Sequence, residues 1–76
     1  MSIRNTRLHR VSATEIKTEI LSCVKQGRNL TPSEIVANIL VLFPAHSYYE
    51  MKFLIKEMQK DQWLVHDIIY GGLRVA

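Results

Sequence analysis

The pattern Ser/Thr-x-x-Glu occurs three times in this chain, and it constrains the fold more than any other feature of the sequence. The copies are Ser12-Ala-Thr-Glu15, Thr31-Pro-Ser-Glu34 and Ser47-Tyr-Tyr-Glu50. In a capping box of this kind, the hydroxyl accepts from the backbone N–H of the glutamate, and the glutamate carboxylate accepts from the N–H of the cap residue. Backbone donors that have no partner inside a helix are thereby satisfied. Because a helical apolar pattern follows each copy, we predict three helices.

The apolar pattern after the first two boxes predicts where those helices run. The first should span about residues 13–26, with Gly27 closing it in the left-handed conformation. The second should begin at Pro32, where a missing N–H is harmless, and end before Pro44. It is apolar nearly all round, which favours a central place in the core or a surface shared with a partner. The pattern is equally compatible with a self-association surface around Val41 and with a singly exposed Val41.

The third helix should span about Tyr48 to Asp61, within a segment of about residues 47–61. Its buried stripe is predicted to consist of Met51, Leu54, Ile55 and Met58. At 100° per residue, the face that points away then carries Tyr49, Lys52, Phe53, Lys56 and Lys60. Tyr48 falls at the flank of the buried side, so we expect its ring to pack there and Tyr49 to be presented to solvent.

Beyond Gln62 the pattern becomes that of a β-hairpin. Residues 63–70 are rich in aromatic and β-branched side chains, and Gly71-Gly72 is a signal for a two-residue turn with positive φ angles. Residues 73–76 would return as the second strand, so that Tyr70 faces Leu73. Because the two faces of the hairpin differ little in apolarity, the sequence leaves open which one packs on the helices.

Charge is unevenly distributed along the chain. Of the ten Lys and Arg residues, Arg4, Arg7 and Arg10 fall within the first eleven residues, which contain no acid. From Ser12 onward seven basic residues balance seven acidic ones, so the net charge of +3 comes from the N-terminal segment. We predict a flexible basic arm over residues 1–11 and a domain over residues 12–76. The arm would either contact phosphates or act as a solvated tail that aids solubility.

Composition indicates one small globular domain of the cytoplasm. The chain has 76 residues, 47% of them hydrophobic, and its longest apolar run is far shorter than the ~20 residues of a membrane-spanning helix. No membrane association is expected. The single cysteine, Cys23, cannot form an internal disulfide, which favours a reducing compartment.

The order of these elements resembles the winged helix-turn-helix superfamily. The resemblance rests on "LTPSEIVANIL", the turn "PAHS", the helix "SYYEMKFLIKEM" and the hairpin "WLVHDIIYGGLRVA". It implies an α+β, mostly α fold of three helices and a C-terminal β-hairpin. In that superfamily the third helix usually enters the major groove of DNA, and the hairpin, or wing, touches adjacent backbone or minor groove. The DNA-binding residues expected here are Ser47, Tyr49, Lys52, Phe53, Lys56, Lys60, Arg4, Arg7, Arg10 and Arg74.

Two features favour a different function for the same surface. The expected wing tip, "YGGL", carries no charge, and the exposed face of the third helix lacks the Arg, Asn and Gln side chains that read bases with two hydrogen bonds. Tyr49 and Phe53, together with the hairpin, would equally suit a protein–protein interaction or dimerisation module that binds no DNA. Both interpretations stay open at this stage.

The sequence offers no catalytic or metal-binding pattern. His9, His46 and His66 are widely spaced, and no C-x-x-C or H-E-x-x-H motif occurs. His66 and Asp67 would point to opposite faces of a strand, and His46 would be a turn residue. We therefore predict a protein that is not an enzyme and uses no cofactor or metal: a small cytoplasmic, dimeric DNA-binding transcriptional regulator, with the protein-binding adaptor as the alternative.

Overall fold

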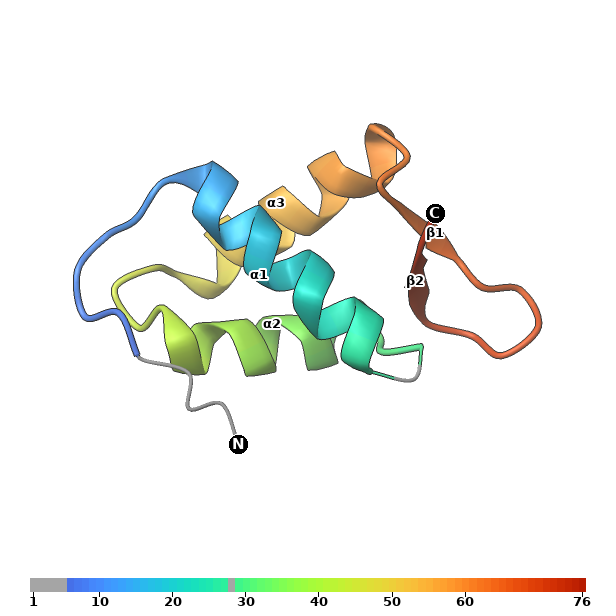
Figure 1. Cartoon of the computed structure of the whole chain (residues 1–76), viewed down its shortest axis with the longest axis horizontal. Helices are drawn as coiled ribbons and strands as arrows, with labels where there is room; N and C mark the ends of the chain where they lie inside the picture. The colour runs from blue at the N-terminus through green and yellow to red at the C-terminus, as the bar shows by residue number, and fades with distance from the viewer. Residues whose placement is uncertain (1–5, 28) are drawn as a thin grey trace.

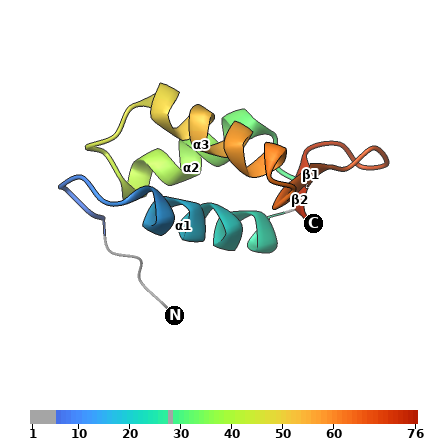
Figure 2. The ribbon, with the colours of Figure 1, turned by 90° about the horizontal axis from the view of Figure 1, so that it is seen from above.

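Three helices and a two-stranded hairpin make up the fold. The computed structural model describes residues 6–27 and 29–76, with α1 at Ala13–Gln26, α2 at Pro32–Leu42, α3 at Tyr48–Lys60, β1 at Leu64–His66 and β2 at Leu73–Val75 (Figure 1). Viewed from above, α1 lies on one side of the molecule, α2 and α3 lie on the other, and the hairpin projects from one end (Figure 2). The predicted α+β, mostly α fold class is confirmed, and the arrangement is compatible with a winged-helix-like architecture.

The helices begin where the capping boxes predict. At α2 and α3 both halves of the box form: the hydroxyls accept from the glutamate N–H groups at 3.3 and 3.1 Å, and the carboxylates accept from the cap N–H groups at 2.9 and 3.2 Å. At α1 only the first half is seen. Ser12 accepts from the N–H of Glu15 at 3.2 Å, while the Glu15 carboxylate lies 3.0 Å from the guanidinium of Arg7.

The core lies between the three helices and is closed at one end by the hairpin. Ile20, Ile35, Phe43 and Met51 are among its fully buried side chains. The predicted stripe of α3 is buried in full: Met51, Leu54, Ile55 and Met58. Leu64 and Leu73 of the hairpin are buried in this core, so the hairpin face that carries them is the one that packs on the helices. Burial of one such side chain contributes about 1.5–3 kcal/mol, so the α1–α2–α3 packing fixes the direction of every α3 side chain.

The hairpin corrects the predicted register. Leu64 pairs with Val75 and His66 with Leu73, so that residues 67–72 form a six-residue loop and Gly71-Gly72 is not a two-residue turn. Asp67 is the physical reason, because its Oδ1 accepts from the backbone N–H groups of the second and third residues that follow, both at 2.9 Å. Such side-chain bonds offer the backbone an alternative to the ladder of a longer strand. As predicted, Gly71 and Gly72 have positive φ, 77° and 70°.

The connector between α1 and α2 meets the hairpin. The N–H of Leu73 donates to the carbonyl of Leu30 at 2.8 Å. The prediction for Gly27 is wrong: its φ is −81°, and the left-handed residue is Asn29, with φ 54°. A Cβ at position 27 would lie 2.7 Å from the side chain of Leu30, so a larger residue there would force that side chain to move.

Within residues 6–27 and 29–76, no helix has the length and apolar character needed to cross a membrane.

Candidate nucleic-acid interface

The outward face of α3 carries the side chains that the sequence proposed as a DNA-reading surface. Tyr49 is 81% exposed and Phe53 is 64% exposed. Lys56 and Lys60 are exposed, and Lys52 is half-buried. Five side chains spaced along one face of a helix of this length form a continuous strip that a groove or a partner can contact.

Tyr48 differs from the prediction. It is 41% exposed, and its ring meets the edge of the Tyr49 ring with centroids 5.8 Å apart. The ammonium of Lys52 lies 5.5 Å from the centroid of the same ring, within range of a cation–π contact. Tyr48 therefore supports the outward strip from its flank, because the core beneath α3 is already filled by aliphatic side chains.

The acidic and basic side chains of α3 lie on different sides of the helix. Its two acids face the α1 side of the helix, where Glu50 binds Arg10 at 2.7 Å and Glu57 binds the ammonium of Lys17. Among the described residues, no ion pair engages Lys52, Lys56 or Lys60. Glu57 adjoins Lys56 and Lys60 but is bound to Lys17, so the lysines make the strip positive, although the described domain is close to neutral.

A pocket of about 300 Å³ joins this strip to the start of α2. Pro32 and Ser33, in the first turn of α2, line one side, and Lys52, Lys56 and Gln59 line the other. At this helix start the N–H groups of Thr31 and Glu34 are bonded within the capping box, and Pro32 has no N–H. The positive charge of the pocket therefore comes from its two lysines, which suit an anion such as a phosphate group.

The basic arm is folded back onto the domain over residues 6–11. The N–H of Arg7 donates to the carbonyl of Leu42 at 2.8 Å, and its guanidinium lies over the ring of Phe43 at 5.2 Å. Arg7 and Arg10 also form ion pairs, with Glu15 and Glu50 respectively. Over these residues the structure differs from the predicted free arm, because each arginine has a carboxylate in reach. Arg4 lies outside the described residues.

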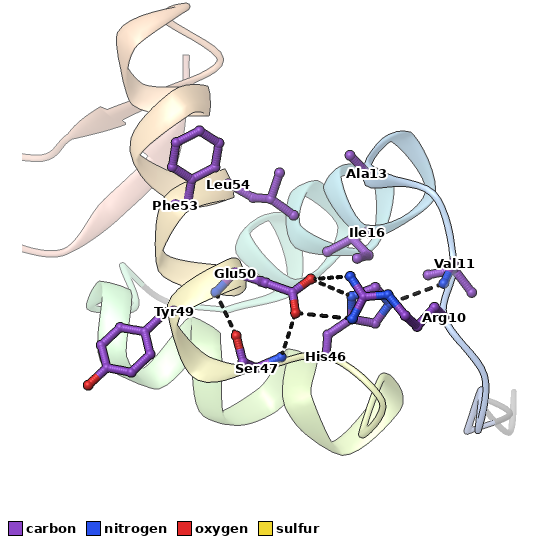
Figure 3. A pocket seen from close by; sticks show the side chains of 10 residues that line it. All are labelled: Arg10, Val11, Ala13, Ile16, His46, Ser47, Tyr49, Glu50, Phe53 and Leu54. Atoms are coloured by element: carbon purple, nitrogen blue, oxygen red, sulfur yellow. Dashed lines mark hydrogen bonds and ion pairs between the residues drawn. The ribbon is translucent and has the colours of Figure 1, made fainter.

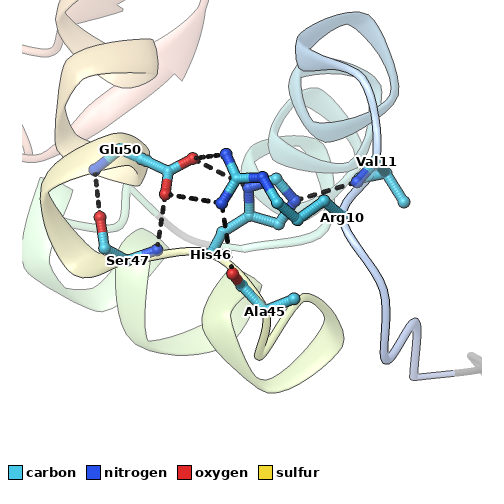
Figure 4. A network of polar contacts seen from close by, with 6 residues as sticks. All are labelled: Arg10, Val11, Ala45, His46, Ser47 and Glu50. Carbon is cyan, nitrogen blue, oxygen red and sulfur yellow. Dashed lines mark hydrogen bonds and ion pairs between the residues drawn. The ribbon is translucent and has the colours of Figure 1, made fainter.

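His46 holds the arm in place, which the sequence did not predict. Its side chain is 2% exposed, Nε2 accepts from the N–H of Val11 at 3.0 Å, and Nδ1 lies 3.0 Å from Glu50 Oε2 (Figure 4). An acceptor at Nε2 assigns the proton to Nδ1, which then donates to the carboxylate. The only sequence signal was the spacing of four residues between His46 and Glu50 within the turn and first helical residues.

Glu50 is the centre of this network. Its pKa is lowered to about 2, first by the hydrogen bond from Arg10 and then by those from His46 and the backbone of Ser47. In turn, hydrogen bonding to Glu50 raises the pKa of Arg10. The carboxylate keeps its charge at any pH near neutrality, so the contact between arm and α3 persists there.

A pocket of about 420 Å³ opens beside this network, between the arm, α1 and α3 (Figure 3). Ile16 and Leu54 line its apolar side, and Arg10 and Glu50 line its polar side. Tyr49 and Phe53 also line the pocket, so the outward strip of α3 and the pocket share two aromatic side chains. A ligand or a partner side chain in the pocket would therefore contact residues that the sequence assigned to DNA.

The wing contributes one cation near the base of its loop. The Arg74 guanidinium is 3.9 Å from Asp67 Oδ2, and its side chain is 55% exposed. Hydrogen bonds from the backbone of Tyr70 and Ile69 lower the pKa of Asp67, and the nearby charge of Arg74 acts in the same direction. The structure thus places Tyr49, Phe53 and the three lysines along the outward face of α3, with Ser47 at its N-cap, while Arg74 lies apart on the hairpin.

Comparison of the chain with protein-family models, with curated proteins and with solved structures finds no match. The described part of the chain contains no group of three His, Cys, Asp or Glu side chains placed to hold a metal ion.

Proposed function

We propose that this protein is a small transcriptional regulator that binds duplex DNA with α3 in the major groove. The observation that carries the proposal is the pocket in which Lys52 and Lys56 face the first turn of α2. In helix-turn-helix proteins the second helix of the unit enters the groove while the first crosses the backbone. Here the phosphate next to the groove would meet the ammonium groups of Lys52 and Lys56. The acids of α3 point to the other side, where they are neutralised within the molecule.

Side chains at the start of α3 would meet the base edges. The exposed ring of Phe53 suits the methyl group of thymine, and the Tyr49 hydroxyl can donate to or accept from a base. The oxygen of Ser47 already accepts from the N–H of Glu50, but its O–H can still donate to a phosphate. With so few polar readers, sequence selection would rest on apolar contact and on DNA shape more than on paired hydrogen bonds.

The arm contributes less to this proposal than the sequence suggested. Arg7 and Arg10 must each break an ion pair before they can bind a phosphate.

Regulators of this kind bind as dimers. The exposed side chains of Leu8 and Val41 flank the hydrogen bond between Arg7 and Leu42, and we take this patch as the candidate dimer contact. Sedimentation of Val41→Lys tests it: a dimer that persists in this variant removes the patch from consideration.

Salt dependence of DNA binding tests the groove assignment. Each phosphate contact contributes about 0.9 to the slope of log K against log salt, so Lys52→Ala and Lys56→Ala should each reduce the slope by about that amount. Lys25→Ala is the matched control, since Lys25 is an exposed lysine on α1 away from the pocket. Unchanged duplex affinity after removal of both α3 lysines, or no duplex binding at low salt, would refute the proposal.

A protein-binding adaptor is the second candidate, and the apolar pocket beside Tyr49 and Phe53 favours it specifically. In that case the pocket would accept an apolar side chain of a partner, and the two aromatic side chains would act as anchors at its edge. Phe53→Ala would then abolish complex formation, and binding would depend little on salt. Strong salt dependence carried by Lys52 and Lys56 would exclude this alternative as the main function.

A further inference from the structure

Three consecutive apolar side chains at the tip of the wing make almost no contact with the rest of the chain. Ile68 is 90% exposed, and Ile69 and Tyr70 are each 80% exposed. The two-residue turn expected from the sequence would have placed these residues in a paired strand. The six-residue loop instead gathers them at the point farthest from the core.

The loop that presents them is held firmly at its base. In addition to the two bonds to Oδ1, the N–H of Asp67 donates to Gly72 and its carbonyl accepts from Gly71, at 2.9 and 2.8 Å. Asn29 donates to Asp67 Oδ2 at 3.3 Å. A Cβ at Gly72 would lie 1.8 Å from the carbonyl oxygen of Asn29, so the loop sits directly on the α1–α2 connector. The tip is therefore pre-organised, and little ordering entropy would be lost when it inserts into a partner.

The position of the loop fits a second groove of the duplex. The loop lies at one end of the long axis of the molecule, and α3 ascends toward that end (Figure 1). From above, the loop projects on the side of α2 and α3, away from α1 (Figure 2). With α3 in the major groove, the loop would therefore lie past the end of that helix and on the same side of the molecule, where a neighbouring minor groove could meet it.

The distribution of charge shows that the tip of the loop is not suited to binding a phosphate. Residues 68–72 contain no charged side chain, so the tip gains nothing from a phosphate. Lys60 at the end of α3 and Arg74 in β2 are exposed cations on either side of the loop in sequence. Cations that hold the backbone beside an apolar tip match the chemistry of minor-groove proteins that press Ile, Leu or Phe between base pairs.

We propose that the loop of Ile68, Ile69 and Tyr70 is an apolar wedge that enters the minor groove and unstacks one base step, bending the duplex held by α3. This inference rests on the proposed DNA-binding function. Wedges of this type bend DNA by about 20–90° toward the major groove. Pyrimidine–purine steps unstack most easily, so a site with a TA or CA step under the loop should be preferred.

The double variant Ile68→Ser, Ile69→Ser tests the wedge, since neither side chain packs in the core. Energy transfer between dyes at the ends of a duplex reports bending, and competition between duplexes with a TA step and with a stiff A-tract reports selection. The wild type should shorten the end-to-end distance and prefer the TA duplex by about tenfold or more. The double variant should keep the salt slope but lose both the bend and the preference. Thr14→Ser, at an exposed β-branched residue of α1, should retain both.

The outcomes distinguish failure of the wedge proposal from failure of the proposed DNA-binding function. A wild type that binds with the lysine-dependent salt slope but leaves the duplex straight overturns the wedge alone. A double variant that still bends the duplex does the same. No duplex binding by the wild type at low salt overturns both proposals. Loss of a wild-type dimer in the double variant, measured by sedimentation, would assign the loop to self-association instead of DNA.

Discussion

Replacement of His46 by phenylalanine tests whether one buried imidazole fastens the arm to the domain. Nε2 accepts from the N–H of Val11 at 3.0 Å, and Nδ1 faces Glu50 at the same distance. The ring also meets Phe43 edge to face, with centroids 6.3 Å apart. Phenylalanine keeps the shape and this ring contact, so the substitution removes only the two polar interactions.

The expected loss of stability follows from the amide that remains. Without Nε2, the partly buried N–H of Val11 has no acceptor, and a buried donor left unsatisfied costs about 1–3 kcal/mol. In a domain of this size, 1 kcal/mol changes Tm by roughly 4–8 °C, so Tm of His46→Phe should fall by roughly 4–24 °C. The lower end applies if the arm detaches, because water then satisfies the amide.

Two further variants separate the two nitrogens. A glutamine at position 46 keeps an acceptor near the place of Nε2, and an asparagine keeps a donor near the place of Nδ1. Thermal unfolding by circular dichroism gives Tm, and hydrogen exchange by NMR gives the protection of the Val11 amide. Protection should survive in His46→Gln and vanish in His46→Asn and His46→Phe. A phenylalanine variant with wild-type Tm and an equally protected Val11 amide would refute the reasoning.

Two more predictions concern acid stability and the wing. The pKa of Glu50 is about 2 in the folded protein, below its ordinary value of 4.5. The ionised carboxylate therefore stabilises the fold fully above pH 4.5, and this stabilisation is lost as the pH falls toward 2. Glu50→Gln should flatten this part of the curve of unfolding free energy against pH, measured by chemical denaturation. Gly72→Ala should lower Tm strongly, because its Cβ overlaps the backbone of Asn29, whereas Gly71→Ala meets no atom within 4 Å and should carry only the ~1–2 kcal/mol of a left-handed alanine. Equal Tm values for the two alanine variants would contradict the close seating of the loop on the connector.

The helices and the outward strip were predictable because they depend on local rules. The capping boxes set the starts of α2 and α3 to the residue, and once the start is fixed a constant 100° per residue places Tyr49 and Lys56 outside and Met51 inside. Helical periodicity averages over many residues, so an error at one position does not change the face. Tyr48 was misplaced because it lies between the two faces, where neighbouring side chains decide.

The wing and the arm were not predictable because their structure depends on contacts between distant residues. A strand has a period of two, and the position of its turn sets the whole register. Asp67 moved that turn by forming side-chain bonds that compete with the ladder, which a Gly-Gly signal conceals. His46 and Arg10 pair across more than thirty residues with partners that only the packing of α1 against α3 brings near. The distribution of charge along the sequence placed Arg10 in an arm without acidic residues, but in the structure Arg10 binds Glu50 of α3.

The attachment of the arm also has a consequence for the newly made chain. Arg10 binds Glu50, forty residues later in the sequence, and Val11 binds His46, thirty-five residues later. Since a protein is synthesised from its N-terminus, Arg10 and Val11 leave the ribosome before the start of α3 does. During that interval Arg10 has no carboxylate of α3 to bind, and the N–H of Val11 has no imidazole acceptor. Residues 10 and 11 are thus secured only after α3 has begun to form, although they are made before α1.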